Sequence, residues 1–203
     1  MHQFHLITDR RFIGVRPLSE VVEQAVQGGV THVQLREKST DLQTVTEIAM
    51  NLKRILDKHG IPLIINDYVS VAKEVDAAGV HVGQDDISCI QARQILGPSK
   101  IVGLSVTNFD EAVVAQAYPV DYLGVGPIFV SQTKPDAAPP IGLEGLAKIK
   151  NYSRHTLVAI GGINHKHAKT IFKMGVGIAI VSAICAASNP QKAAEGFIKA
   201  SSG

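Results

Sequence analysis

Three polar residues that alternate along one segment have the types needed to hold an anion. Gln34, Arg36 and Lys38 would share one face of a β-strand, because side chains on a strand alternate between its two faces. An amide, a guanidinium and an ammonium would be costly to bury together without an anionic partner. A fork-shaped guanidinium beside an ammonium suits a clamp for a phosphorylated substrate. The alternative is a solvated strand end in which Arg36 pairs with Glu37.

Carboxylates follow the next two apolar segments of the chain. Asn66-Asp67 ends the first segment, and Gly83-Gln84-Asp85-Asp86 ends the second. If these segments are adjacent parallel strands, their ends lie about 5 Å apart and face the cationic clamp. Mg²⁺ is commonly held by one or two carboxylates together with substrate phosphates. The pattern therefore predicts a magnesium site rather than a zinc site, although Asp85 could instead cap the following helix.

Hydroxyl groups and glycines end the remaining apolar segments. Ser105 ends one of them, residues 131–134 (Ser-Gln-Thr-Lys) follow another, and Gly161-Gly162 and Val181-Ser182 end the last two. Glycine lets backbone amides approach a ligand, while hydroxyls and a cation suit a phosphate. Residues 135–142 are too rich in proline for a helix. We expect this segment to be either a lid over a site or a rigid loop that crosses the surface.

Eight apolar runs rich in Val and Ile alternate with amphipathic segments. We predict strands at Phe4–Thr8, His32–Glu37, Ile61–Asp67, Val80–Gln84, Lys100–Val106, Asp121–Pro127, His155–Gly162 and Gly177–Ile184. Alternation of strands with helices favours a parallel sheet, and eight units of about 25 residues match a barrel of eight strands. The expected fold is therefore a single compact α/β domain, a (β/α)8 TIM barrel over residues 1–203. Active sites of such barrels lie where strands end, which is where all of the polar groups above fall.

Helix ends are marked at two places. Asp41 is expected to cap a helix that runs up to Lys58-His59-Gly60, and Asn189-Pro190 to begin the final helix. His32, His81 and His155 are interpreted as structural or surface residues.

Composition excludes several classes of protein. Hydrophobic residues make up 45% of the chain and charged residues 19%, which excludes intrinsic disorder. A net charge of +2 from scattered residues argues against a nucleic-acid or membrane-surface binder, and no apolar run is long enough to span a membrane. The first residues lack the features of a signal peptide, and Cys89 and Cys185 match no metal or redox spacing. We expect a cytoplasmic protein with reduced thiols, and the sequence leaves a homo-oligomer open.

Six ordered motifs resemble those of thiamine-phosphate synthase, also called thiamine-phosphate pyrophosphorylase. They are Gln34-Leu35-Arg36-Glu37-Lys38, Asn66-Asp67, Gly83-Gln84-Asp85-Asp86, Gly126-Pro127-Ile128-Phe129, Thr133-Lys134 and Ala159-Ile160-Gly161-Gly162-Ile163. The resemblance covers essentially the whole chain. It implies a (β/α)8 transferase that uses Mg²⁺ to join a hydroxymethylpyrimidine diphosphate to a hydroxyethylthiazole phosphate, giving thiamine phosphate and pyrophosphate. The partners would then be small phosphorylated substrates.

The resemblance also implies a role for each matching residue. The pyrimidine diphosphate would be bound by Gln34, Leu35, Arg36, Glu37, Lys38, Asn66, Ser105 and Lys134. Of these, Arg36, Lys38, Ser105 and Lys134 would be catalytic, and Asp67 and Asp86 would be the Mg²⁺ ligands. The thiazole phosphate would be bound by Ser131, Gln132, Thr133, Gly162, Val181 and Ser182, where the family usually has Thr in place of Ser131.

Three other functions are weighed against this one. A thiazole tautomerase has a similar barrel, but its catalytic histidine on the loop after the sixth strand has no counterpart at Gly126-Pro127. Another phosphate-binding barrel enzyme, such as an isomerase of tryptophan or histidine synthesis, is the second. A non-catalytic regulator that binds phosphate ligands is the third. The synthase reaction needs no strong base or nucleophile if the pyrimidine cation forms first, so positioning and electrostatics would suffice.

Overall fold

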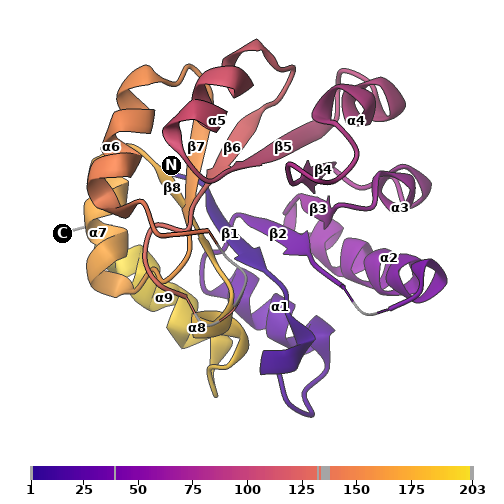
Figure 1. The fold of residues 1–203 in the computed structure, drawn as a ribbon. Coiled ribbons are helices and arrows are strands. Elements are labelled where there is room, and N and C mark those ends of the chain that lie inside the picture. The colour runs from indigo at the N-terminus through magenta and orange to yellow at the C-terminus, as the bar shows by residue number, and fades with distance from the viewer. Residues whose placement is uncertain (1, 39, 132, 134–137, 202–203) are drawn as a thin grey trace.

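Eight parallel strands close into a barrel in the computed structural model, which describes residues 2–38, 40–131, 133 and 138–201. The strands are β1 (Phe4–Ile7), β2 (His32–Leu35), β3 (Leu63–Asn66), β4 (Gly79–Val82), β5 (Ile101–Val106), β6 (Tyr122–Val125), β7 (Thr156–Ile160) and β8 (Gly177–Ile180). Each strand pairs with the next along the chain, and β8 pairs with β1, where Phe4 is in register with Ile178. The predicted (β/α)8 barrel is confirmed (Figure 1).

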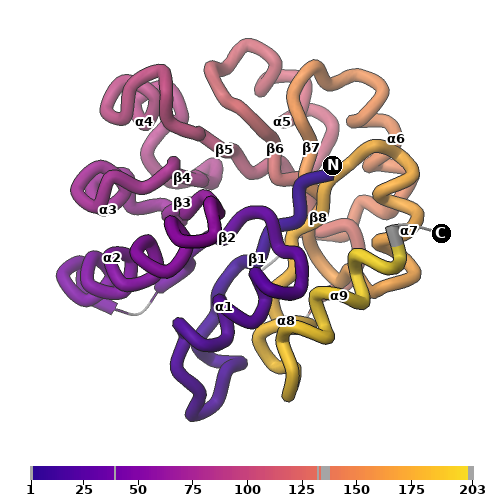
Figure 2. Tube along the Cα trace, turned by 180° about the vertical axis from the view of Figure 1, so that it is seen from behind, coloured from indigo at the N-terminus to yellow at the C-terminus, as the bar shows by residue number. Residues whose placement is uncertain are grey.

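Helices surround the barrel on all sides (Figure 1). They are α1 (Leu18–Gln27), α2 (Leu42–His59), α3 (Val69–Glu74), α4 (Cys89–Leu96), α5 (Phe109–Val114), α6 (Gly142–Tyr152), α7 (His165–Lys173), α8 (Ser182–Cys185) and α9 (Pro190–Ser201), with short 3-10 helices η1 (Arg10–Phe12) and η2 (Ala115–Ala117). The last helix, α9, packs against both α1 and α7, so it completes the outer ring (Figure 2). Among the described residues, no helix has both the length and the hydropathy of a membrane span.

Two predicted helix boundaries are confirmed by their capping contacts. The Asp41 carboxylate accepts a hydrogen bond from the Thr44 amide at 2.9 Å, and α2 ends at Gly60 in the left-handed conformation. The Asn189 side chain accepts a hydrogen bond from the Lys192 amide at 2.8 Å, at the start of α9.

Several strands are shorter than predicted. After β2, the Arg36 amide donates to the Thr8 hydroxyl at 3.0 Å rather than to a neighbouring strand. The predicted strand Gly177–Ile184 is wrong beyond Ile180, because the Val181 carbonyl accepts a hydrogen bond from the Cys185 amide at 2.9 Å and the chain turns into α8. After Ile180 the sequence stays largely apolar although the backbone has left the sheet.

Alternate residues of β1 belong to two separate apolar regions. Phe4 and Leu6 pack in the large core between the strands and the helices, whereas Ile7 belongs to a small cluster inside the barrel. Glycine makes room for larger rings in this interior. A Cβ at Gly103 would lie 2.5 Å from His81 Nδ1 and closer still to the Tyr122 ring. The rings of His81 and Tyr122 thus occupy space inside the barrel that a side chain at position 103 would fill.

Candidate active site

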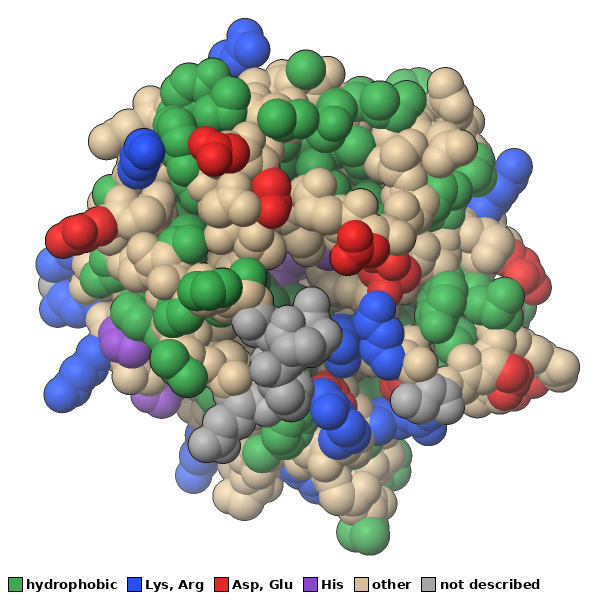
Figure 3. Space-filling model, in the orientation of Figure 1, with side chains coloured by type: hydrophobic (Ala, Val, Ile, Leu, Met, Phe, Trp, Pro, Cys, Tyr) green, Lys and Arg blue, Asp and Glu red, His purple; other side chains and the backbone are tan. Residues whose placement is uncertain are grey.

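A cavity of about 750 Å³ opens at the carboxyl ends of the strands, and residues on or just after every strand line it. In Figure 3 a hollow near the centre of this face has histidine at its floor, with acidic and basic side chains gathered on its rim. Twelve of the predicted site residues line the cavity: Gln34, Arg36, Lys38, Asn66, Asp67, Asp86, Ser105, Ser131, Thr133, Gly162, Val181 and Ser182. Gln132, Lys134 and residues 135–137 of the predicted lid lie outside the described residues.

Two predicted site residues have side chains that point elsewhere. The Leu35 side chain is buried in the core between strands and helices. The Glu37 carboxylate accepts hydrogen bonds from Arg10 Nε, at 3.0 Å to each oxygen, on the outer side of the barrel mouth. Side-chain contacts of Leu35 and Glu37 with a ligand in the cavity are therefore not supported, and the alternative pairing of Arg36 with Glu37 is wrong as well.

The two predicted metal ligands meet across adjacent strand ends. The carboxyl groups of Asp67 and Asp86 are close enough to shift each other's pKa, and Lys38 forms an ion pair with Asp67. Asp86 also accepts a hydrogen bond from the Gly83 amide at 2.8 Å. The backbone of Asp67 is left-handed, with φ 65°, a conformation that Asp adopts more readily than most residues with a side chain.

Ser88, rather than Asp85, caps helix α4. The Ser88 hydroxyl accepts a hydrogen bond from the Gln91 amide at 3.2 Å. Asp85 is exposed and outside the cavity, so neither capping nor metal binding is assigned to it.

The two carboxyls titrate as a pair. Burial raises the pKa of the Asp67 carboxyl, and the neighbouring Asp86 charge raises it further against the opposing effect of Lys38. Burial also acts to raise the pKa of Asp86, but the hydrogen bonds from Asp67 and from the Gly83 amide bring it below its usual range. Two like charges held together, with oxygen donors only, fit Mg²⁺. Among the described residues no third Asp, Glu, His or Cys joins the pair, so water and substrate oxygens would complete the shell.

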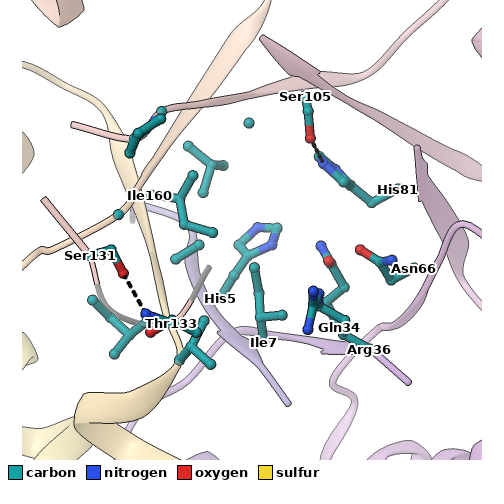
Figure 4. Close-up of a pocket in the computed structure, with 18 of the residues that line it drawn as sticks. His5, Ile7, Gln34, Arg36, Asn66, His81, Ser105, Ser131, Thr133 and Ile160 are labelled. Atoms are coloured by element: carbon teal, nitrogen blue, oxygen red, sulfur yellow. Dashed lines mark hydrogen bonds between the residues drawn. The ribbon is translucent and has the colours of Figure 1, made fainter. Parts of the chain in front are cut away.

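A buried histidine forms the wall beneath Ser105. His81 Nε2 lies 2.8 Å from Ser105 Oγ (Figure 4). His81 Nδ1 lies 2.9 Å from the Tyr122 hydroxyl. Burial lowers the pKa of His81 to about 4, so the ring is neutral at pH 7. The prediction that His81 is a structural or surface residue is incomplete, because it both lines the cavity and holds Ser105 in place.

The floor of the cavity holds a second histidine that the sequence did not indicate. His5 is 1% exposed and its ring stacks on His32, with ring centres 4.4 Å apart. Burial lowers the pKa of His5 well below its usual range, and the nearby His32 and His81 act in the same direction. The signal that could have identified His5 is the alternation of side chains along β1, which directs His5 into the barrel on the same face as Ile7.

The loops after β6, β7 and β8 meet at the opposite side of the cavity. Thr133 Oγ1 lies 3.4 Å from Ser182 Oγ, and Ser131 Oγ accepts a hydrogen bond from the Thr133 amide at 3.2 Å. Gly162 has φ 62°, and a Cβ there would lie 2.8 Å from Phe129 Cβ. Figure 4 shows Ser131 and Thr133 on one side of the cavity, and Gln34, Arg36 and Asn66 on the other. The cavity thus has one side with cations and carboxylates and another with hydroxyls and glycine.

Comparison with known proteins shows which family has this arrangement. Residues 4–184 match the family model described as thiamine monophosphate synthase. This chain belongs to that family. The predicted family, barrel fold and transferase activity of a thiamine-phosphate synthase are thereby confirmed.

Individual relatives of the synthase family match over most of their length. The thiamine-phosphate synthase of Albidiferax ferrireducens is 47% identical over 193 residues, which cover 95% of this chain and 88% of the relative. That of Clostridium botulinum is 46% identical over 184 residues, or 90% of each chain. The solved thiamine phosphate pyrophosphorylase from Pyrococcus furiosus superposes with a TM-score of 0.89 at 38% identity, covering 98% of this chain and 94% of that one.

Proposed function

We propose that this protein is a Mg²⁺-dependent thiamine-phosphate synthase that joins a pyrimidine diphosphate to a thiazole phosphate. The observation that supports it best is the pair Asp67 and Asp86 facing Arg36 and Lys38 across one end of the cavity. Two carboxylates that would bind a divalent cation, next to two cations, suit a diphosphate that must leave with its charge stabilised.

The cationic side of the cavity would receive the pyrimidine diphosphate. Arg36, Lys38 and, from the family resemblance, Lys134 would bind the diphosphate oxygens and stabilise the charge that develops on them. Mg²⁺ held by Asp67 and Asp86 would supply further positive charge there. The amides of Gln34 and Asn66 line the same side and would orient the pyrimidine ring.

The hydroxyl side of the cavity would receive the thiazole phosphate. Its donors would be the hydroxyls of Ser131, Thr133 and Ser182, with backbone amides at Gly162 and Val181 and the neighbouring Gln132. Glycine at position 162 fits the left-handed backbone, with φ 62°, and the close approach of Phe129 and Val130, which together would hold this loop and its amides beside the anion.

The reaction would need no strong base from the protein. The bond between the pyrimidine methylene carbon and the diphosphate oxygen breaks, and its electron pair leaves with the diphosphate. The thiazole nitrogen then donates its lone pair to that carbon, which gives thiamine phosphate and pyrophosphate. His81 is neutral and both of its ring nitrogens are engaged, so its role would be to fix Ser105 against the pyrimidine. Holding the two substrates in line would supply much of the rate.

The setting of the reaction is part of the proposal. Cys89 and Cys185 are both free and buried, which suits a reducing compartment, and we place the protein in the cytoplasm with small phosphorylated molecules as its partners. A homo-oligomer is compatible with this function.

A direct assay tests the proposal. The protein is mixed with both substrates and Mg²⁺, and thiamine phosphate and pyrophosphate are measured. Asp67→Asn and Asp86→Asn should each lower the rate at least tenfold, about 1.4 kcal/mol of activation free energy, while the fold persists. Asp85→Asn is the matched control, since that carboxylate lies outside the cavity. Absence of product, or full activity in excess chelator, would refute the proposal.

A further inference from the structure

A buried carboxylate at the end of β1 lies between two guanidinium groups. Asp9 is 4% exposed, and its oxygens accept hydrogen bonds from Arg11 Nε at 3.0 Å and from Arg11 Nη2 at 2.6 Å. On the other side, Arg36 Nη1 lies 3.6 Å from the same carboxylate. Asp9 therefore contacts two cations from different loops, although it does not line the cavity.

The two guanidinium groups lead to opposite sides of the cavity. Arg36 lines the side with Lys38 and the paired carboxylates. Arg11 lies outside the cavity, and its Nη2 donates to the Thr133 carbonyl at 2.9 Å. Thr133 in turn contacts Ser182 on the hydroxyl side. The Asp9 carboxylate is thus connected to one side of the cavity through Arg36 and to the other side through Arg11.

The charge on Asp9 is kept, and no neighbouring acid replaces it. Burial alone would raise the pKa of the Asp9 carboxyl, but hydrogen bonds from the Arg11 side chain and backbone, with the charge of Arg36, lower it. Glu37, which follows Arg36 in sequence, is engaged by Arg10 at 3.0 Å. Loss of the Asp9 charge would leave Arg11 and Arg36 without their shared partner.

We propose that Asp9 is a positioning residue that orients Arg36 and Arg11 together and so aligns the two substrate subsites. This inference rests on the proposed function, in which Arg36 binds the diphosphate and Thr133 the thiazole phosphate. Joining two bound molecules requires that the attacking nitrogen be held in line with the departing oxygen. A single anion shared by both subsites fixes the distance and angle between them.

Three variants separate the two connections. Asp9→Asn keeps the size of the side chain and an oxygen for the Arg11 amide, but removes the charge. It should lower kcat and raise KM for both substrates, each at least fivefold, because misaligned substrates react more slowly once bound. Arg11→Ala should raise KM for the thiazole phosphate at least threefold and leave that for the pyrimidine diphosphate within twofold. The double variant should have the thiazole phosphate KM of Asp9→Asn alone, because both changes break the same connection.

A second Asp–Arg pair provides the matched control. Asp121 accepts hydrogen bonds from Arg93 at 2.6 Å and from the Val102 amide at 2.7 Å, at the opposite ends of the strands. Asp121→Asn should lower Tm and leave kcat and both KM values within twofold. The same result for Asp9→Asn would overturn the inference, as would effects of Asp9→Asn and Arg11→Ala that multiply in the double variant.

Failure of the inference and failure of the proposed function give different results. If the wild-type protein makes no thiamine phosphate, the function is wrong, and calorimetric binding of inorganic pyrophosphate and of hydroxyethylthiazole phosphate replaces the KM values. The same pattern among the variants is then expected. If Asp9→Asn does not fold, Arg11→Ala alone decides, and an unchanged thiazole phosphate KM or affinity overturns the inference.

Discussion

Acidification from pH 7 to pH 5 should destabilise the protein through His81, the histidine that is hydrogen-bonded to Ser105. His81 is buried between Tyr122 and Ser105, and its pKa falls from 6.5 to about 4 on folding. Below pH 6.5 the unfolded chain binds a proton at this ring and the native state does not. The contribution of neutral His81 to stability is therefore fully present above pH 6.5 and is lost as the pH falls towards 4. His5, with its pKa also lowered by burial, acts in the same direction.

The size of the effect follows from the two pKa values of His81. Because the pKa of His81 falls from 6.5 to about 4 on folding, the free energy of unfolding should decrease by roughly 2 kcal/mol between pH 7 and pH 5. The slope approaches about 1.4 kcal/mol per pH unit, which corresponds to one proton taken up on unfolding. This loss is a large part of the roughly 5–15 kcal/mol by which domains are stable.

Urea unfolding at several pH values between 7.5 and 5 measures this loss directly. The range stops above the region where carboxylates of the unfolded chain titrate. His81→Asn should be less stable than wild type at pH 7, because the contacts with Tyr122 and Ser105 change, but its stability should fall less steeply with pH. Equal slopes for the two proteins, or a wild-type stability that is flat over the range, would refute the account of His81.

Three further predictions concern the interior and the two sides of the cavity. Gly103→Ala forces a Cβ against Tyr122 and should cost about 1–3 kcal/mol in urea unfolding, whereas Gly196→Ala, whose Cβ meets a flexible side chain, should cost less than about 1 kcal/mol. Ser182→Ala should raise KM for the thiazole phosphate about threefold, because roughly one hydrogen bond to the phosphate is lost. An equal rise in KM for both substrates would show that Ser182 is assigned to the wrong subsite. Arg36→Ala should lower kcat/KM for the pyrimidine diphosphate about tenfold or more with Tm within a few degrees, because Asp9 keeps its hydrogen bonds with Arg11, the shorter at 2.6 Å. If the Arg36 variant unfolds but its folded fraction is fully active, Arg36 has a structural role rather than a role in binding the diphosphate.

The strand-end polar residues could be predicted because topology alone brings them together. Once eight strand–helix units imply a barrel, Asp67 and Asp86 must end neighbouring strands, and the structure pairs them. The exact end of a strand could not be read in the same way. Leu35 and Glu37 continue the pattern of β2, but their side chains face away from the cavity.

Residues that depend on long-range packing escaped prediction. His81 alternates with glycines and valines, as a core residue would, and its role depends on Tyr122 and Ser105 from two other strands. The space for its ring comes from Gly103. Asp9 is similar. The sequence assigned Arg36 only to the anion clamp and gave Arg11 no role, and both become partners of Asp9 only when β1 and β2 are side by side.

The pairing of β1 with β8 has a consequence for how the protein is made. On the ribosome β1 emerges first, but its partner Ile178 follows only near the end of synthesis. A nascent chain or a truncated fragment therefore has two unpaired strand edges, which are templates for aggregation. Ring closure over almost the whole chain is entropically costly and slows folding. The walls of the cavity come from all eight strands, so incomplete chains should be both inactive and clients for chaperones.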